Sequence, residues 1–413
     1  MRLSVATNFD PALVDSLRGF PVVELFGKLR EDAVGGGRAS YQLAPVSRKR
    51  LAAHVRDART AGIGFNYLLN ASCLGNREIT RRGQSEIEGL CGWLREIGVE
   101  SVTVSSPYLL RLVKTRFPEL KVRISVFGGV DRVRKARMWE EMGADGIVLD
   151  SLLVNRELAS LSQIRKTVNC DLELLVNNSC LSACALSPTH MNALAHAGQS
   201  GHENRGFLID WCFLRCTEMK LRAPVNYIRS EWIRPEDLHL YEGMGYDFFK
   251  VAERDLPTPV MVNRVRAYAA RRYDGNLLDL VQPYAFRDLS GNATYYRKGA
   301  GWFLRFLFRP GLVNPARMLL LKRLADLRHM TRPVEGMPPV YVDNRALDGF
   351  MERFRETGCR DLECEECRWC HQFAEKAVRV DEAQRAQALA AYEALFRALD
   401  GGGMWRYLSG RRT

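Results

Sequence analysis

The sequence predicts an α/β protein: a (β/α)8 TIM-like barrel followed by a C-terminal, mostly helical and cysteine-rich appendage. Short β-rich apolar runs alternate with helical patterns up to about residue 255. Eight such units in ~250 residues are what a parallel barrel requires, and its strands are apolar because both faces are buried. A doubly wound open sheet is the alternative, since one miscounted strand would leave the barrel unclosed. The predicted strands span residues 3–7, 22–26, 64–69, 101–106, 122–127, 146–150, 172–176 and 248–252.

The segments between these runs have helical periodicity. In "SEIEGLCGWLREIG" (85–98) the apolar residues recur at the 3.6-residue spacing of one helix face, and Cys91 lies among them. We therefore expect Cys91 to be a packing residue. Cys170 precedes the seventh strand and is also expected to be structural. Cys73 follows the third strand, on the side where barrel enzymes build their sites, and is a ligand or a packed thiol.

The chain divides near residue 280. Residues 1–280 are the predicted barrel, with a long excursion at 180–245 between the seventh and eighth strands. Loops of this length inside a compact domain usually carry function. Residues 281–413 form the helical appendage, which holds a four-cysteine motif at 359–370. Within it, "GWFLRFLFRP" (301–310) is expected to be a buried helix with outward-reaching arginines, or else a docking surface.

The composition is that of an ordinary globular protein, with 46% hydrophobic and 26% charged residues. The first residues show no basic region followed by an apolar stretch, and no apolar run approaches the ~20 residues of a membrane span. We therefore expect a soluble cytoplasmic protein without a transmembrane segment. The formal net charge of +12 predicts an anionic partner, or serves only solubility.

The chain has 11 cysteines, and those that cluster are expected to serve metal binding or redox chemistry, because disulfides rarely persist in the cytosol. Cys180 and Cys184 lie just past the seventh predicted strand, and Cys212 and Cys216 follow in the same excursion. A three-residue gap lets both sulfurs of a pair point the same way from one helical turn. Two such pairs supply the four thiolates of a tetrahedral zinc site or a 4Fe–4S cluster.

A second set, Cys359, Cys364, Cys367 and Cys370, has the compact spacing C-x4-C-x2-C-x2-C. One short segment can wrap a single metal centre in this way, as ferredoxin-like cysteine runs do. The motif predicts a second metal site, either another 4Fe–4S cluster or a zinc site that fixes the tail.

Polar residues at predicted strand ends are candidates for catalysis, because that rim of a barrel carries the chemistry. Asp150, Asn177, Glu253 and Arg254 are the predicted catalytic residues, and Arg254 could hold a carboxylate or phosphate through two hydrogen bonds. An ordinary ion pair at the rim is the alternative for Glu253 and Arg254. The other polar residues at strand ends are Asn8, Lys28, Asn70 and Asn178.

The sequence around the first cysteine pair resembles the collagenase-like peptidases of family U32. Their signature runs from a glutamate through a small-residue turn to a cysteine and then a second cysteine, and "ELLVNNSCLSAC" (173–184) is similar to it. Asn178 stands where the family often has glycine, and the apolar residue before the first cysteine is missing. The stretches at 232–255 and 273–281 are also similar, so the resemblance covers roughly residues 1–281.

Several members of that family are oxygen-independent hydroxylases despite the peptidase name. The resemblance implies an oxygen-independent hydroxylation, or a related modification, of an anionic small molecule, a peptide or RNA, with prephenate as an oxygen donor. It also implies a 4Fe–4S cluster, which carried over residue by residue would bind Cys180, Cys184, Cys212 and Cys216. The second cysteine set is not a general family feature and indicates a distinct subgroup.

Two other functions are alternatives. A peptidase needs an activated nucleophile or a metal-bound water, and the sequence has neither G-x-S-x-G nor H-E-x-x-H. His190, His196 and His202 recur at six-residue intervals, which a surface loop explains as readily as a site does. The second alternative is a non-catalytic iron–sulfur or zinc protein that serves as the partner subunit of another protein.

A basic stretch after the eighth strand, "NRVRAYAARRYDGN" (263–276), bears on the RNA prediction. Its arginines and tyrosines suit phosphate contacts and base stacking. A solvated helix explains the same pattern and is the interpretation that we favour.

Overall fold

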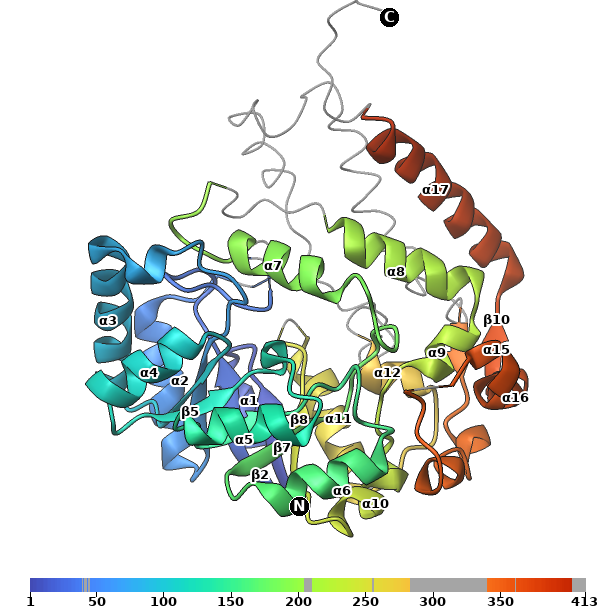
Figure 1. Ribbon diagram of the computed structural model, residues 1–413, viewed down its shortest axis with the longest axis horizontal. Helices are drawn as coiled ribbons and strands as arrows, with labels where there is room; N and C mark the ends of the chain where they lie inside the picture. Colours follow the sequence, from blue (N-terminus) through green and yellow to red (C-terminus); the bar gives the residue numbers. More distant parts are fainter. Residues whose placement is uncertain are drawn as a thin grey trace, which may run out of the picture.

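The computed structural model describes residues 1–38, 40, 43, 45–203, 210–254, 256–282, 340–360 and 362–402. Its centre is a closed barrel of eight parallel strands in chain order, in which the first strand pairs with the eighth (Figure 1). The prediction of a closed barrel rather than an open sheet is confirmed. The strands are β1 (Arg2–Ala6), β2 (Val22–Gly27), β3 (Gly64–Leu69), β4 (Ser101–Val104), β5 (Lys121–Ile124), β6 (Gly146–Val148), β7 (Asp171–Leu175) and β8 (Phe248–Val251).

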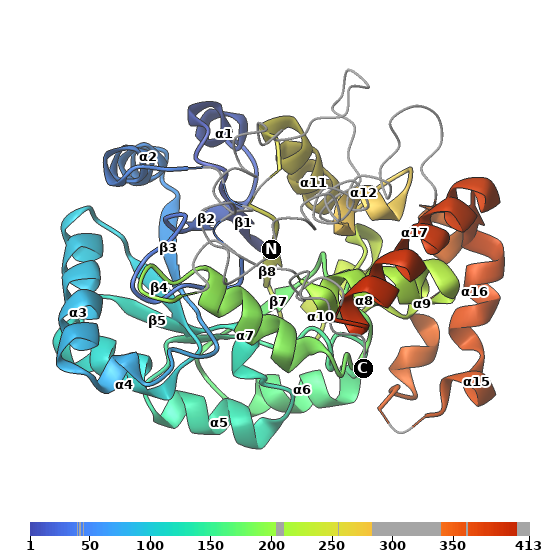
Figure 2. The same cartoon turned by 90° about the horizontal axis from the view of Figure 1, so that it is seen from above.

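Helices surround the barrel, as Figure 2 shows from above. Several begin at the signals that the sequence carries: Ser106 caps α4 through its side chain and Pro107 occupies the first helical position. The predicted packing stripe on α3 is confirmed, because Cys91 is completely buried. The surrounding helices are α1 (Pro11–Ser16), α2 (Arg48–Thr60), α3 (Arg81–Glu96), α4 (Pro107–Arg116), α5 (Val133–Glu141), α6 (Leu158–Thr167), α11 (Thr258–Ala270) and α12 (Leu277–Val281).

The excursion between β7 and β8 adds a layer of helices to the barrel. Figure 1 shows α7 and α8 lying above one end of the barrel, and the two helices contact each other. Because parallel strands all end at the same side, residues that follow the strands and residues of these helices can meet there. The helices of the excursion are α7 (Ser187–Ala197), α8 (Trp211–Arg222), α9 (Val225–Arg229) and α10 (Leu238–Glu242).

The two faces of the strands differ in chemistry. Side chains that face the surrounding helices, such as Leu3, Val5 and Leu25, are buried and apolar. Alternate residues point into the barrel, and several of these are polar or charged, such as Glu24 and Arg123. The prediction of strands that are apolar on both faces therefore holds for the outer face only.

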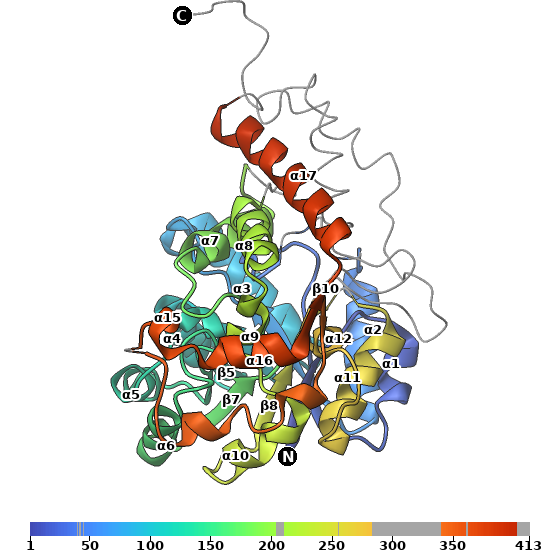
Figure 3. The same cartoon turned by 90° about the vertical axis from the view of Figure 1, so that its right-hand side faces the viewer.

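The C-terminal appendage packs against the excursion. It consists of an antiparallel pair, β9 (Val340–Val342) and β10 (Val378–Val380), with α15 (Cys364–Cys367), α16 (Trp369–Ala377) and α17 (Glu382–Asp400). Helix α16 lies against α9, and α17 contacts α8 (Figure 3). The predicted helical character of this region is confirmed. The segment at 301–310 lies outside the described residues, and the division near residue 280 stays a prediction.

Candidate functional site

A cavity of about 280 Å³ opens where the strands end. Its floor consists of the last inward-facing side chains of the barrel, and α7 and α8 cover it from above. This is the face on which barrel enzymes place their catalytic residues. The floor residues are Phe26, Leu68, Thr103, Ser125, Val148, Leu175, Lys250 and Ala252.

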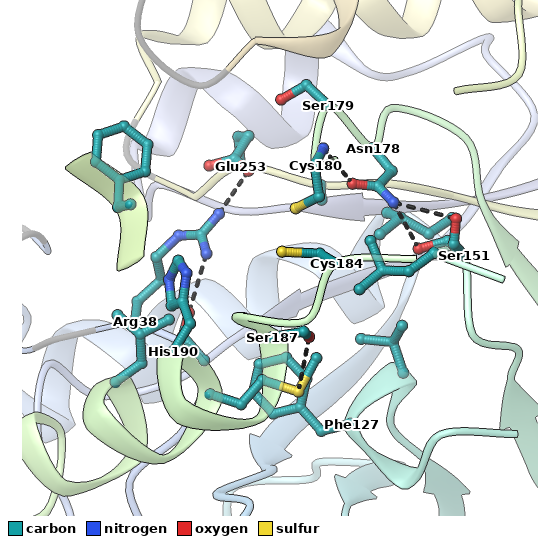
Figure 4. Close-up of a pocket in the computed structure, with 18 of the residues that line it drawn as sticks. Arg38, Phe127, Ser151, Asn178, Ser179, Cys180, Cys184, Ser187, His190 and Glu253 are labelled. Atoms are coloured by element: carbon teal, nitrogen blue, oxygen red, sulfur yellow. Dashed lines mark hydrogen bonds and ion pairs between the residues drawn. The ribbon is translucent and has the colours of Figure 1, made fainter. Parts of the chain in front are cut away.

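All four cysteines of the predicted first set line this cavity: Cys180, Cys184, Cys212 and Cys216. None of them forms a disulfide. Figure 4 shows the sulfur atoms of Cys180 and Cys184 directed into the same space. The structure therefore brings together thiols that are up to 36 residues apart in the sequence, from Cys180 to Cys216.

The first pair does not lie on a helical turn, contrary to the prediction. Asn178 accepts a hydrogen bond from the Cys180 backbone N–H through its side-chain oxygen at 2.9 Å, which forms a turn instead. Ala183 has a φ of 46°, in the left-handed region that interrupts a helix. Helix α7 begins only at Ser187, after both cysteines.

The second pair has the predicted arrangement. Cys212 and Cys216 are both on α8, four positions apart and therefore on one helix face. Asp210 fixes the start of this helix by accepting a hydrogen bond from the Phe213 backbone N–H at 3.0 Å. A second oxygen of Asp210 lies 3.3 Å from Nε2 of His190, which also lines the cavity.

A buried ammonium accompanies the thiols. Lys220, one turn beyond Cys216 on α8, is only 7% exposed, and its Nζ donates a hydrogen bond to the carbonyl oxygen of Ser179. Desolvation raises the pKa of the Cys216 thiol to about 12 and also raises the pKa of Cys180, while the charge of Lys220 acts in the opposite direction on both. As free thiols these cysteines are protonated near neutral pH, and they require a metal to become thiolates.

The donor set suits a thiophilic metal centre. A tetrathiolate site has four cysteine ligands and a net negative charge. The four free thiols match the ligand count, and the buried Lys220 can offset part of the negative charge. Among the described residues, no three His, Cys, Asp or Glu side chains are arranged as a metal site would be.

Asn177, Glu253 and Arg254 line the cavity, but Asp150 does not. The Asn177 amide exchanges two hydrogen bonds with the Ala252 backbone, at 2.7 and 3.0 Å, and so holds the ends of β7 and β8 together. Asp150 accepts a hydrogen bond from the Leu152 backbone N–H at 3.0 Å, and desolvation raises the pKa of its carboxyl group. Asn177 is therefore a positioning residue, and Asp150 lies outside the cavity wall.

Glu253 forms an ion pair with Arg38, with 2.5 Å between the carboxylate and the guanidinium (Figure 4). Its φ of 92° is in a region that residues other than glycine rarely adopt, so the end of β8 is strained where it enters the cavity. Arg38, which the sequence did not single out, follows a glycine run at 35–37. Gly36 and Gly37 lie so close to Asn70 and Phe127 that a side chain at either would collide with them.

The remaining rim residues have structural roles. Asn8 donates to the Leu256 carbonyl at 2.9 Å, away from the cavity. Lys28 forms a buried ion pair with Asp32 at 2.9 Å, and Asp32 also accepts two backbone hydrogen bonds from the loop that leads to Arg38. Asn70 lines the cavity and donates to Ser125 Oγ at 3.2 Å.

Two comparisons place the chain among known proteins. The model of peptidase family U32 matches residues 36–207, which include Arg38 and the first cysteine pair. An uncharacterized protease of Methanocaldococcus jannaschii is 32% identical over 347 residues, which are 84% of this chain and 86% of that protein. The chain belongs to peptidase family U32.

Solved structures are similar at lower identity. A U32 peptidase is 20% identical with a TM-score of 0.48, covering 62% of this chain and 94% of its own. A D-psicose 3-epimerase determined with D-fructose is 12% identical with a TM-score of 0.32, covering 50% and 88%. In the part of this U32 chain that the structure describes, no helix combines the length and apolar character that crossing a membrane requires.

A charged network in the barrel of this U32 protein was not predicted from its sequence. Arg123 lies 2.6 Å from Glu24 and 3.6 Å from Glu173, and Lys250 lies 3.4 Å from Glu173. Lys250 also lines the cavity and lies over the ring of Phe26, 4.0 Å from its centroid. Alternation with apolar neighbours on β2, β5, β7 and β8 is the signal that could have placed these charges inside.

The basic stretch after β8 is only partly solvated. Arg264 and Tyr268 are buried in α11, and Arg264 donates to the carbonyl oxygens of Asp279 and Gln282 at 3.0 and 2.6 Å. Arg271 and Arg272 are exposed, and they form ion pairs with Glu242 and Asp274. The expectation of a solvated helix is wrong for Arg264 and Tyr268, because both side chains are buried and donate hydrogen bonds to backbone carbonyls of neighbouring segments. Whether RNA is the partner stays a prediction.

Proposed function

We propose that this U32 protein is an iron–sulfur enzyme that performs an oxygen-independent hydroxylation, or a related modification, of an anionic substrate in the cavity. One observation carries the proposal: a single cavity is lined by four cysteines and by the buried Lys220. The cysteines are Cys180, Cys184, Cys212 and Cys216. A purely structural site would not need to face a space of about 280 Å³. A cluster bound there would supply one-electron redox chemistry or a Lewis-acidic iron.

Such a reaction replaces a hydrogen by a hydroxyl group without molecular oxygen. In balanced form, R–H and a hydroxyl donor X–OH give R–OH and X–H, so the donor loses its hydroxyl and gains the hydrogen. The substrate is oxidised by two electrons and the donor is reduced by two. The family resemblance implies a carboxylate-bearing donor, and the chain must bind its negative charge.

The cavity offers cationic groups for this task. Arg38 reaches the cavity with its guanidinium held by Glu253, and Arg254 follows on the same strand end. A guanidinium can hold a carboxylate through two parallel hydrogen bonds. Lys250 adds an ammonium at the floor. These residues bind and orient anionic groups next to the thiols, and the helices α7 and α8 limit the access of water.

The test is the iron and acid-labile sulfide content of the anaerobically purified chain, with its electron paramagnetic resonance spectrum after reduction. We expect the wild type to show a 4Fe–4S signal. Cys180→Ser should remove or strongly alter both this signal and turnover, while the thermal midpoint of the variant changes little. Cys73→Ser is the matched control, because Cys73 lies outside the cavity. A Cys180→Ser variant that loses the cluster but keeps its activity contradicts the proposal, and a variant that unfolds favours a structural centre.

A peptidase is the second candidate. The M. jannaschii relative is described as a protease, and the His190–Asp210 pair lines the same cavity as Cys180. A cysteine with a histidine and an acid is a known nucleophilic arrangement, but desolvation raises the pKa of Cys180 where a nucleophile needs it lowered. Peptide hydrolysis that persists in iron-free protein and is lost in His190→Gln would establish the peptidase function instead.

A further inference from the structure

The second cysteine set lines a cavity of its own, of about 30 Å³. Cys359 precedes α15, Cys364 and Cys367 form the ends of α15, and Cys370 is on α16. Figure 3 shows these helices packed against the excursion. A space of this size holds about one water molecule and is too small for an organic substrate. The other residues of its wall are Arg229, Arg353, Phe354, Leu362 and Trp369.

A buried cation beside this cavity provides an independent observation. Arg156 is only 1% exposed, and its backbone N–H donates a hydrogen bond to the carboxylate of Glu231, which is also buried, at 3.2 Å. Its guanidinium donates to the carbonyl oxygens of Ile228, Arg229 and Ser230, at the end of α9. Its Nε has no hydrogen-bond partner. A buried guanidinium is stabilised by negative groups nearby, and the four thiolates of a metal centre would add to the Glu231 carboxylate.

The thiols are the groups that can supply this negative charge. The Arg156 guanidinium lies over the rings of Phe350 and Phe354, 4.7 and 5.6 Å from their centroids, and Phe354 is in the wall of the cavity that the four cysteines line. Four thiolates around a zinc ion carry a net charge of minus two, as do four thiolates around an oxidised 4Fe–4S cluster. Arg229, in the wall of the cavity, adds a second guanidinium.

We propose that Cys359, Cys364, Cys367 and Cys370 hold a second tetrathiolate metal centre, separate from the barrel site and neutralised in part by the buried Arg156. The separation follows from α9: Tyr227 lines the large cavity, and Arg229, two residues later, lines the small one. The two centres share this helix as a common wall. Metal in the appendage therefore holds α9, and with it one side of the large cavity.

Metal analysis of the intact chain tests the proposal. Zinc, iron and sulfide are measured per chain in three proteins: the wild type, the double variant Cys364→Ser/Cys367→Ser, and the double variant Cys212→Ser/Cys216→Ser. We expect each double variant to lose one centre and keep the other. If both centres contain iron, each loses about half of the iron; if the second centre contains zinc, only Cys364→Ser/Cys367→Ser loses it. Both results support the proposal, and Cys73→Ser should change neither metal.

A cobalt titration covers the case in which the C-terminal variant does not fold. The Cys212→Ser/Cys216→Ser chain, which keeps the appendage intact, is freed of metal and titrated with Co²⁺. We expect one equivalent to bind with the visible absorption bands and the sulfur-to-cobalt charge transfer of a tetrahedral thiolate site. The proposal is overturned if this chain shows no such bands, or if Cys364→Ser/Cys367→Ser retains the wild-type metal content.

Discussion

Lys220 donates a hydrogen bond from its buried ammonium to the carbonyl oxygen of Ser179, the residue directly before Cys180. This contact joins α8, which carries the second cysteine pair, to the turn that carries the first pair. It also leaves the lysine charge near Cys180 and Cys216, where it favours the thiolate over the thiol. One side chain thus joins the two cysteine-bearing segments and places a positive charge between them.

Replacing Lys220 by methionine should lower the reduction potential of the cluster that we propose for the cavity. A nearby positive charge stabilises the more negative, reduced state, so its removal makes reduction less favourable. The measurement is a potentiometric titration followed by electron paramagnetic resonance. Lys220→Arg should preserve most of the potential, and Arg222→Met is the control on the same helix, because Arg222 pairs with Glu218 and Glu393 outside the cavity. An unchanged potential in Lys220→Met would show that the ammonium does not act on the cluster.

Replacing Asn178 by alanine should reduce the amount of iron bound without unfolding the barrel. Its amide group orients Cys180 through the backbone N–H and is itself held by Ser151 Oγ at 3.1 Å. The substitution removes the acceptor that orients the part-buried Cys180 N–H, and with it the fixed position of the first thiol. Iron content and urea denaturation are measured together, with Asn192→Ala as the control for an exposed asparagine that bonds to Ser72. Full iron content in Asn178→Ala would contradict this role.

Replacing Arg123 by methionine should destabilise the barrel by about 3–5 kcal/mol, because it leaves Glu24 and Glu173 buried without their guanidinium. The free energy of unfolding in urea gives the value. Arg95→Met breaks an exposed pair with Glu119 and should cost less than about 1 kcal/mol. A cost for Arg123→Met as small as that of the control would mean that water or proton uptake compensates the two carboxylates.

His54 should make the protein less stable in mild acid. Desolvation lowers the pKa of this buried histidine from 6.5 to about 4, and its ring is hydrogen-bonded to Thr7 Oγ1 at 2.7 Å. Between these pH values the unfolded chain binds more protons than the folded one. The contribution of the neutral His54 ring to the free energy of unfolding is therefore complete above pH 6.5. It is lost as the pH falls toward 4, and the loss is at most ~3 kcal/mol.

The check for His54 is the free energy of unfolding at pH 7, 5.5 and 4.5, measured in the wild type and in His54→Asn. The variant should be less stable than the wild type at pH 7, but its free energy of unfolding should fall less on acidification. His239→Asn changes an exposed histidine and should leave the pH dependence as it is in the wild type. Parallel pH profiles for wild type and His54→Asn would rule out this histidine as the source.

Local patterns in the sequence were sufficient for the barrel. Each strand run is short, apolar and followed by a helical pattern, and all eight predicted strands overlap the observed ones. The cysteine pairs could be grouped because the excursion follows a strand end, which the topology brings to the mouth. The turn at Cys180 could not be predicted, because it depends on Asn178 and on the left-handed Ala183.

Residues that act through tertiary contacts could not be predicted from the sequence. Lys220 looks like any lysine on a surface helix, and only the packing of α8 over the barrel buries it. Arg38 reaches the cavity through a glycine-lined loop, and its partner Glu253 is 215 residues away. Asp150 was expected at the site because it ends a strand, but its carboxylate instead caps the turn at Leu152.

The contact between the excursion and the appendage has a consequence for how the chain unfolds. Trp232, fully buried, lies against Phe350 with 5.3 Å between ring centroids, and Arg234 donates to the Asn344 carbonyl at 2.8 Å. Loss of the appendage would expose this apolar surface of the excursion to water. The described parts of the barrel and the appendage should therefore melt in one cooperative transition, and a chain shortened to its barrel would be prone to aggregate.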